Sequence, residues 1–219
     1  MACPVTSEST RMALLMAAGE LFAEHGVEAV STRAIAGKAG ANLGMIHYYF
    51  GCKEGLLNAA LDFALELWED DPLGSYLESR RGQLKTPAGQ GEALAGMVDL
   101  FFKVLFSPLK PWWCCTLAFQ VLQRDLPASG RVFAKAGDPN LRPLRELYRL
   151  VTGDEDFETG YCWALAVVAG PVVNAVNPLA LRRVHPDGEA SPGFLVKLQA
   201  VCTRNALAGL GLRPAAKQC

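Results

Sequence analysis

The chain has 219 residues, of which 51% are hydrophobic and 20% are charged, with a formal net charge of −1 at pH 7. This length fits one large domain or a small domain joined to a larger one, and the hydrophobic fraction favours a subunit interface or an internal pocket besides a core. A net charge near zero excludes a global basic field for nucleic acid and an acidic field for a basic partner.

No segment of the sequence has the pattern of a signal peptide or of a membrane-spanning helix. Residues 1–10 contain no apolar run, and nowhere do about 20 apolar residues follow one another without interruption. The most apolar stretch, Tyr161–Val176, is broken by Gly170, Pro171 and Asn174, so we interpret it as a buried or interface helix. The sequence therefore predicts a cytoplasmic protein that makes no contact with a membrane.

Apolar periodicity near the N-terminus predicts the first helices of the chain. Residues spaced three, four and seven apart mark the first helix, namely Leu14, Ala18, Leu21 and Phe22. Gly26 follows them as a typical C-terminal stop. Ser31 then precedes a second helical run, Thr32–Ala39, whose free first-turn amides its hydroxyl can bind.

The Gly-Ala-Asn sequence at 40–42 predicts a tight turn into a third helix, Leu43–Phe50, because glycine can adopt a positive φ and asparagine can cap a helix. Ile46 and Phe50 lie four residues apart in this helix and are expected to face the core. Two helices joined in this way form a helix-turn-helix, whose second helix can lie in the major groove of DNA. Helix pairs of this kind also occur as plain structure, so spacing alone leaves DNA binding open.

The rest of the chain also has helical patterns. From Lys53 to about Leu77 the apolar residues predict a longer amphipathic helix, which Pro72 and Gly74 kink or end early. Glycine and proline residues predict a loop at Arg80–Gly91. Further helices are predicted at Glu92–Phe106, Trp112–Leu126, Arg131–Val151, Phe157–Asn177 and Phe194–Gly209. The sequence has no alternating β pattern, so the expected fold class is all-α.

Five short segments between Ala13 and Leu61 follow one another in an order that is typical of one family. They are Phe22–Gly26, Ser31–Ala36, Ala39–Gly40, Gly44–Phe50 and Lys53–Leu57. Through them the chain resembles the TetR family of transcriptional regulators. The resemblance implies an N-terminal three-helix, helix-turn-helix DNA-binding domain at 8–52 and a larger helical ligand-binding and dimerisation domain at 53–212. It also implies a repressor that binds a palindromic double-stranded DNA operator as a homodimer and responds to a small-molecule effector, without a cofactor.

The matched residues around the second helix have physical roles on DNA. Thr32 lies in the first turn, where its hydroxyl and the free amides can bind a phosphate oxygen, although simple capping is the alternative for Thr32 and Ser31. Arg33 has the fork geometry that pairs with O6 and N7 of guanine, and its alternative is a solvated surface charge. Lys53 stands where the resemblance implies a lysine that contacts phosphate.

The third helix is predicted to present five residues to DNA, namely Leu43, Gly44, Met45, His47 and Tyr48. Gly44 lets the DNA backbone approach closely, and Met45 offers an apolar contact for a thymine methyl group. Tyr48 and Tyr49 can donate hydroxyl hydrogen bonds to phosphates, or one of them can pack against the next helix. His47 replaces the usual tyrosine of the family, so the operator sequence cannot be transferred from a relative.

Aromatic residues on several predicted helices indicate an effector cavity in the second domain. We predict that four of them surround it, namely Phe102, Trp112, Phe119 and Trp163. Few polar residues accompany them, so the expected effector is largely apolar or aromatic. An ordinary packed core is the alternative interpretation.

Two of the predicted helices favour a dimer. Phe157–Asn177 and Phe194–Gly209 are apolar on more than one face, and small residues such as Ala166 and Gly170 allow close helix approach. Two such helices from each subunit predict a four-helix interface. The alternative is that they complete the core of a monomer.

The sequence contains no recognisable catalytic constellation. It has three histidines, no nucleophile elbow, no phosphate-binding glycine loop and no H-E-x-x-H, so we expect no enzyme activity. Its seven cysteines have no metal-ligand spacing, which predicts buried thiols and no metal site. A disulfide between the adjacent Cys114 and Cys115 would be strained, so a redox sensor is not expected. A helical adaptor whose helix-turn-helix is only structural stays open as an alternative.

Overall fold

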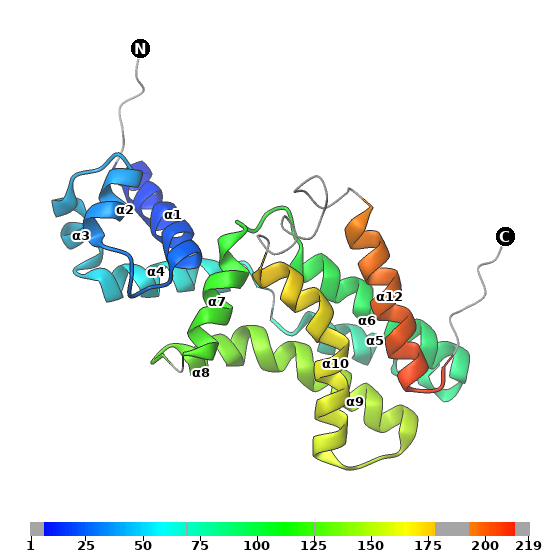
Figure 1. Cartoon of the computed structure of the whole chain (residues 1–219). Helices are drawn as coiled ribbons and strands as arrows, with labels where there is room; N and C mark the ends of the chain where they lie inside the picture. Colours follow the sequence, from blue (N-terminus) through cyan, green and yellow to red (C-terminus); the bar gives the residue numbers. More distant parts are fainter. Residues whose placement is uncertain (1–6, 69, 125, 178–192, 213–219) are drawn as a thin grey trace. The chain divides into compact units, whose positions relative to one another are not determined.

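The computed structural model describes residues 7–68, 70–124, 126–177 and 193–212, and the secondary structure in them is entirely helical. The first part of the chain forms α1 (Ser7–His25), α2 (Thr32–Lys38), α3 (Leu43–Phe50) and α4 (Lys53–Glu66). The middle forms α5 (Pro72–Arg80), the 3-10 helix η1 (Arg81–Lys85), α6 (Pro87–Leu105), α7 (Trp113–Gln123) and α8 (Ser129–Val132). The last part forms the π-helical η2 (Phe133–Gly137), α9 (Asp138–Thr152), α10 (Phe157–Val176) and α12 (Phe194–Gly209) (Figure 1). The predicted all-α fold class is confirmed.

Contacts between Cα atoms divide the chain into two compact units. The N-terminal unit comprises Met1–Leu67 and Leu109–Val132, and the C-terminal unit comprises Trp68–Pro108 and Phe133–Cys219. Helices α7 and α8 therefore belong with the first four helices, although a long stretch of sequence separates them. The predicted domains at 8–52 and 53–212 are defined by function and not by contacts, and they stay predictions.

Trp113 of α7 lies at the centre of the packing in the N-terminal unit. Its side chain is fully buried, and its ring centroid lies 5.9 Å from that of Phe63 in α4. Gly19 of α1 faces the indole so closely that a Cβ atom there would lie 2.5 Å from it. Gln120, two turns further along α7, donates a hydrogen bond of 2.9 Å to the carbonyl of Ala23. These contacts attach α7 to both α1 and α4.

Local hydrogen bonds shape the two short helices. The Ser31 hydroxyl accepts a hydrogen bond of 3.1 Å from the amide of Ala34, and Asn42 Oδ1 accepts one of 2.8 Å from the amide of Gly44. Gly40, in the turn between the helices, has a φ of +62°, which glycine adopts without strain. The predicted caps of both helices and the glycine turn are therefore confirmed.

The core of the C-terminal unit lies among α5, α6, α9, α10 and α12. Helix α10 packs against α9 and α12, and α12 also packs against α6. Large buried side chains from these helices fill the space between them, including Leu73, Leu94, Met97, Phe102, Leu144, Leu147, Val167 and Leu207. By length and composition alone, helix α10 could cross a membrane. Within the chain, 28% of its most apolar window is buried.

The predicted helix that starts at Lys53 ends early, as Pro72 indicated. Helix α4 stops at Glu66, and α5 begins at Pro72. Asp71 caps the new helix, because its carboxylate accepts a hydrogen bond of 3.0 Å from the amide of Gly74. Proline fits the first turn of a helix, where its missing amide proton has no partner to lose.

The predicted loop at Arg80–Gly91 is wrong. The last residue of α5, the 3-10 helix η1 and the first turns of α6 occupy this range. Thr86 caps α6, since its hydroxyl accepts a hydrogen bond of 3.1 Å from the amide of Gly89. Gly89 is buried, and a Cβ atom there would lie 1.9 Å from the carbonyl oxygen of Gln83. The glycine that suggested a flexible loop instead permits close backbone packing.

Candidate nucleic-acid interface

The structure brings all nine predicted DNA-binding residues into the N-terminal unit, on α2, on α3 and at the start of α4. The exposed members of this set are Arg33, Gly44, His47 and Tyr48, and the half-buried members are Thr32, Leu43, Met45, Tyr49 and Lys53. Ile35 and Ile46, one on each short helix, are fully buried beneath them. The apolar faces of α2 and α3 thus fix the helices, while their polar faces stay exposed to solvent.

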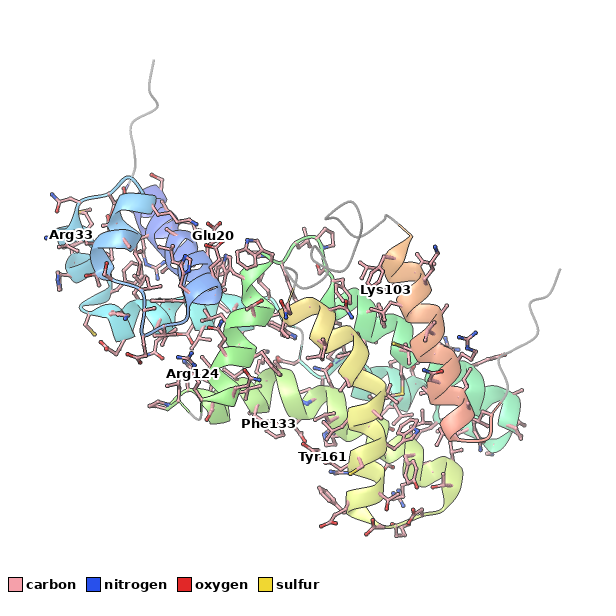
Figure 2. All side chains as sticks on the ribbon, viewed as in Figure 1. Glu20, Arg33, Lys103, Arg124, Phe133 and Tyr161 are labelled. Atoms are coloured by element: carbon pink, nitrogen blue, oxygen red, sulfur yellow. The ribbon has the colours of Figure 1, made fainter. Side chains whose placement is uncertain are left out.

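The charges around α2 and α3 favour an anionic partner. Between Glu28 and Glu54 the sequence has no acidic residue. Arg33 points away from the ribbon of α2 (Figure 2), and no carboxylate pairs with it in the described part of the chain. Lys53 lies at the first turn of α4 and donates a hydrogen bond of 3.3 Å to the carbonyl of Glu28. Both cations can therefore reach a phosphate or a base without breaking an ion pair.

Lys38 is the exception among the basic residues of this region. Its ammonium lies 2.8 Å from the carboxylate of Glu20 in α1, and this hydrogen bond raises the pKa of Lys38. The ion pair joins the end of α2 to α1. Because a carboxylate already neutralises it, Lys38 contributes less positive charge to the surface than Arg33 does.

The two tyrosines of α3 have different surroundings. The side chain of Tyr48 is 77% exposed, which suits contact with a partner. Tyr49 is half-buried, and its hydroxyl lies 2.8 Å from that of Ser7 at the start of α1. The rings of the two tyrosines meet edge to face, with centroids 4.9 Å apart. Tyr49 is thus the more buried tyrosine of the pair, and its hydroxyl contacts α1.

Arg11 of α1 is a basic neighbour of α3 that no motif in the sequence indicates. Its guanidinium carbon lies 5.6 Å from the centre of the Phe50 ring, and its nearest carboxylate, that of Glu8, is 3.7 Å away. The sequence gives little indication of this position, because a lone arginine in the first turns of a helix is common. Only the packing of α1 on α3 reveals the proximity.

Three further positions lie on α3 and at the start of α4. A Cβ atom at Gly44 would meet only the cap oxygen of Asn42, at 3.4 Å, so the surface there is open to a close approach. Cys52 occupies the N-cap position of α4 and makes no side-chain capping bond. Gly55 follows in the first turn, where a Cβ atom would lie 2.0 Å from the carbonyl oxygen of Phe50. Only glycine lets α4 start this close to the end of α3.

The four predicted effector-binding residues do not lie in one unit. Phe102 and Trp163 belong to the core region of the C-terminal unit, where Trp163 packs against Tyr148 with ring centroids 5.6 Å apart. Trp112 and Phe119 belong to the N-terminal unit, and Trp112 is 42% exposed. The predicted grouping of these four side chains is therefore not seen within either unit.

The C-terminal unit contains a cleft of about 500 Å³ with a different lining. Its walls come from α5, η1, α9, α10 and the turn before α10, and none of the four predicted aromatics lines it. Most of its arginines are paired with carboxylates in the same cleft: Arg81 with Glu78 and Glu146, Arg142 with Asp71, and Arg149 with Glu146 and Glu155. Hydrogen bonds from Arg149 lower the pKa of Glu146. The cleft is thus a network of ion pairs.

The buried thiols of α7 are unreactive by their surroundings. Burial raises the pKa of Cys114 to about 12 and that of Cys115 to about 11. The thiolate is the reactive form of cysteine, so a raised pKa leaves little of it at neutral pH. The prediction of buried thiols is confirmed for Cys114 and Cys115 and is wrong for Cys52 and Cys162, which are exposed.

Residues 14–60 match the sequence profile of the family described as bacterial regulatory proteins, tetR family. Over 59 residues the chain is 42% identical to the HTH-type transcriptional repressor Rv3405c of Mycobacterium tuberculosis. It is equally similar to the HTH-type transcriptional regulator Mb3439c of Mycobacterium bovis. This similarity covers 27% of the chain and 31% of either relative, so the chain spans about a third of the length of the curated relatives that it matches.

Solved structures resemble the chain over most of its length. A mutant of the HlyIIR protein is 19% identical, with a TM-score of 0.59, and the match covers 93% of this chain and 98% of that one. A TetR-like transcriptional regulator from Rhodococcus sp. RHA1 is 19% identical, with a TM-score of 0.55, over 96% of this chain and 99% of the other. At these identities the likeness concerns the fold. The segment 14–60, which contains the helix-turn-helix of this chain, thus resembles the tetR family of bacterial regulatory proteins.

Proposed function

We propose that the protein is a transcriptional repressor that binds double-stranded operator DNA through α2, α3 and the start of α4. The observation that carries the proposal is the exposure of Arg33, His47 and Tyr48, in a stretch without acidic residues, above the fully buried Ile35 and Ile46. A helix of this kind fits the major groove. The repressor name of the relative that matches this segment supports the direction of regulation.

Each residue of the predicted DNA-binding set has a role in the proposal. Arg33 reads a base edge, because its fork of donors matches O6 and N7 of guanine. Thr32 and Lys53 bind phosphates, which sets the position of the helices without reading sequence. Leu43, Gly44, Met45, His47, Tyr48 and Tyr49 supply the remaining contacts along α3.

The proposal includes a homodimer formed by α10 and α12. These helices carry large apolar side chains on their exposed faces, namely Leu165, Val173, Leu195, Val196 and Val201. Leu165, Ala169 and Val173 follow at four-residue spacing, so they form one stripe along α10. A second copy would cover this stripe, and an interface with another protein chain also accounts for the apolar character of α10 without a membrane.

The proposal further includes a small-molecule effector that binds the predicted domain at 53–212 and changes operator affinity, in a cytoplasmic protein without enzyme activity. Phe102, Trp112, Phe119 and Trp163 stay the predicted contacts for a largely apolar effector. An effector acts only by binding one conformation of the repressor better than another.

The test is a selection of random double-stranded DNA by the purified protein, followed by binding measurements at several salt concentrations. We expect an inverted repeat whose half-sites are separated by about one DNA turn, ~34–36 Å. Affinity should fall linearly with salt on logarithmic axes, because phosphate contacts release counterions. A helical adaptor would enrich no motif and would show no such slope, and that result would reject the proposal.

A further inference from the structure

His47 and Gly51 form a pair of hydrogen bonds at the end of α3. The amide of Gly51 donates to the carbonyl of His47 at 3.1 Å. In the other direction, Nδ1 of the His47 ring lies 2.9 Å from the carbonyl oxygen of Gly51. A carbonyl oxygen can only accept a hydrogen bond, so Nδ1 must carry the proton. The backbone at the helix end therefore fixes both the orientation and the tautomer of the imidazole.

The fixed tautomer decides what the other ring nitrogen can do. In a neutral imidazole with its proton on Nδ1, Nε2 has a lone pair and acts only as an acceptor. The His47 side chain is exposed, and no residue in the described ranges pairs with Nε2. The ring therefore presents an unused acceptor on the exposed side of α3.

An acceptor is an unusual group to present to DNA, because most polar atoms of DNA are acceptors themselves. Phosphate oxygens, O6 and N7 of guanine and O4 of thymine all accept hydrogen bonds. In the major groove the donors are the exocyclic amino groups of adenine and cytosine. An acceptor on a helix in that groove therefore favours adenine or cytosine and gains nothing from guanine, thymine or phosphate.

We propose that His47 is a specificity-determining residue that selects adenine or cytosine at one position of each half-site by accepting a hydrogen bond at Nε2. The inference rests on the proposed function. It concerns a position at which this chain departs from the tyrosine that the TetR family usually has. A tyrosine hydroxyl both donates and accepts, whereas the held imidazole only accepts.

The first experiment compares DNA selections by three proteins under identical buffer conditions. They are the full-length wild type, His47→Phe, and His25→Phe as the matched control, which makes the same change at an exposed histidine of α1 outside the predicted DNA-binding set. We expect one column of the wild-type motif to contain adenine or cytosine and to become random with His47→Phe. The same column should persist with His25→Phe. A preference for guanine or thymine in the affected column would overturn the inference.

The second experiment removes single atoms from the selected base. If the base is adenine, purine lacks its amino group and 7-deazaadenine lacks N7 but keeps the amino group. Wild type should lose about three- to tenfold in affinity per half-site with purine, the range of one neutral hydrogen bond, and nothing with 7-deazaadenine. His47→Phe should not distinguish adenine from purine. If the base is cytosine, 2-pyrimidinone, which lacks the amino group, takes the place of purine.

A third measurement tests the tautomer without DNA. Nitrogen-15 spectra of the full-length protein, with the His47 signals assigned by their loss in His47→Phe, should show a protonated Nδ1 and a lone pair on Nε2. A protonated Nε2 would overturn the inference even if the protein binds an operator. An enriched motif in which no column depends on His47 would overturn the inference about His47 but not the proposed function. A protein that enriches no DNA would overturn both.

Discussion

Arg33 and Lys53 are both exposed enough to meet DNA, but they differ in what they can contact. Arg33→Ala should relax specificity at one base position, with a discrimination loss of about 1–3 kcal/mol, because a bidentate contact to a base edge is lost. Lys53→Ala should weaken binding to all sequences about equally and lower the salt slope by about one, because a phosphate contact carries no sequence information. Binding of operator variants at several salt concentrations measures both effects.

Arg33→Ala and Lys53→Ala serve as controls for each other. The two residues carry the same charge and lie outside the core of the N-terminal unit, so neither change should unfold the protein. Equal losses on every operator variant with both substitutions would contradict the division of roles between them.

Gly19 and Gly37 provide a matched test of packing in the N-terminal unit. A Cβ atom at Gly19 would lie 2.5 Å from the Trp113 indole, whereas a Cβ atom at Gly37 would meet nothing within 4 Å. Gly19→Ala should therefore lower the free energy of unfolding by about 1–3 kcal/mol, because the buried indole must move. Gly37→Ala should raise it by about 0.5–1 kcal/mol, since alanine is the better helix former.

Urea unfolding of the two variants and the wild type decides this prediction. A destabilisation of Gly37→Ala as large as that of Gly19→Ala would show that the contact with Trp113 does not matter. Sequence alone could not distinguish the two glycines, because both lie in predicted helical runs. They differ only because Trp113 of α7 packs against Gly19.

At the scale of elements, the sequence predicts helices well where a local hydrogen bond marks their ends. Ser31 and Asn42 identify the starts of α2 and α3, and the structure shows both caps. The start of α6 was missed because Pro87 and the glycines after it are typical of loops. In the structure Thr86 caps these residues and Gly89 is buried, so tertiary packing overrides their weak helix propensity.

The cap at Thr86 can be tested directly. Thr86→Ala should lower the free energy of unfolding by about 0.5–2 kcal/mol, because the amide of Gly89 loses its acceptor at the helix start. Ser75→Ala, at an exposed position of α5, is the control and should change stability by less than about 0.5 kcal/mol. If Thr86→Ala behaves like the control in urea unfolding, α6 does not depend on its cap.

At the scale of the whole molecule, the candidate site divides into a part that the sequence predicts and a part that it does not. The predicted DNA-binding residues are close in sequence, so the motif itself holds them together. The aromatic residues for the effector come from distant helices, and their grouping depends on which unit each helix joins. Trp112 and Phe119 belong to the N-terminal unit, which no periodicity of the sequence could indicate.

The proposed dimer is a property of the whole molecule that a single substitution can test. Val173 is 59% exposed in the apolar stripe of α10. Val173→Glu should convert a dimer to a monomer in sedimentation at micromolar concentration, because each interface would bury uncompensated charge. Operator affinity should fall with it, since the two half-sites are then bound independently.

Leu109→Glu is the control, because Leu109 is 83% exposed but lies outside α10 and α12. It should leave the sedimentation coefficient and the operator affinity unchanged. A monomeric wild type, or a Val173→Glu protein that stays dimeric, would move the interface away from α10.

Because α7 belongs to the N-terminal unit, this unit cannot complete its packing until α7 has been synthesised. Residues 68–108 separate the two parts of this unit in the chain, and their synthesis at ~5–20 residues per second takes about 2–8 seconds. During that interval α1 and α4 have already been made, but the surfaces of Gly19 and Phe63 that will receive Trp113 still face water. A nascent chain that stops after Leu67 contains every residue of the matched segment 14–60 and still lacks the helix that completes its packing. Premature termination should therefore yield an incompletely folded product that chaperones and proteases recognise. We do not expect a small folded protein that binds operator DNA.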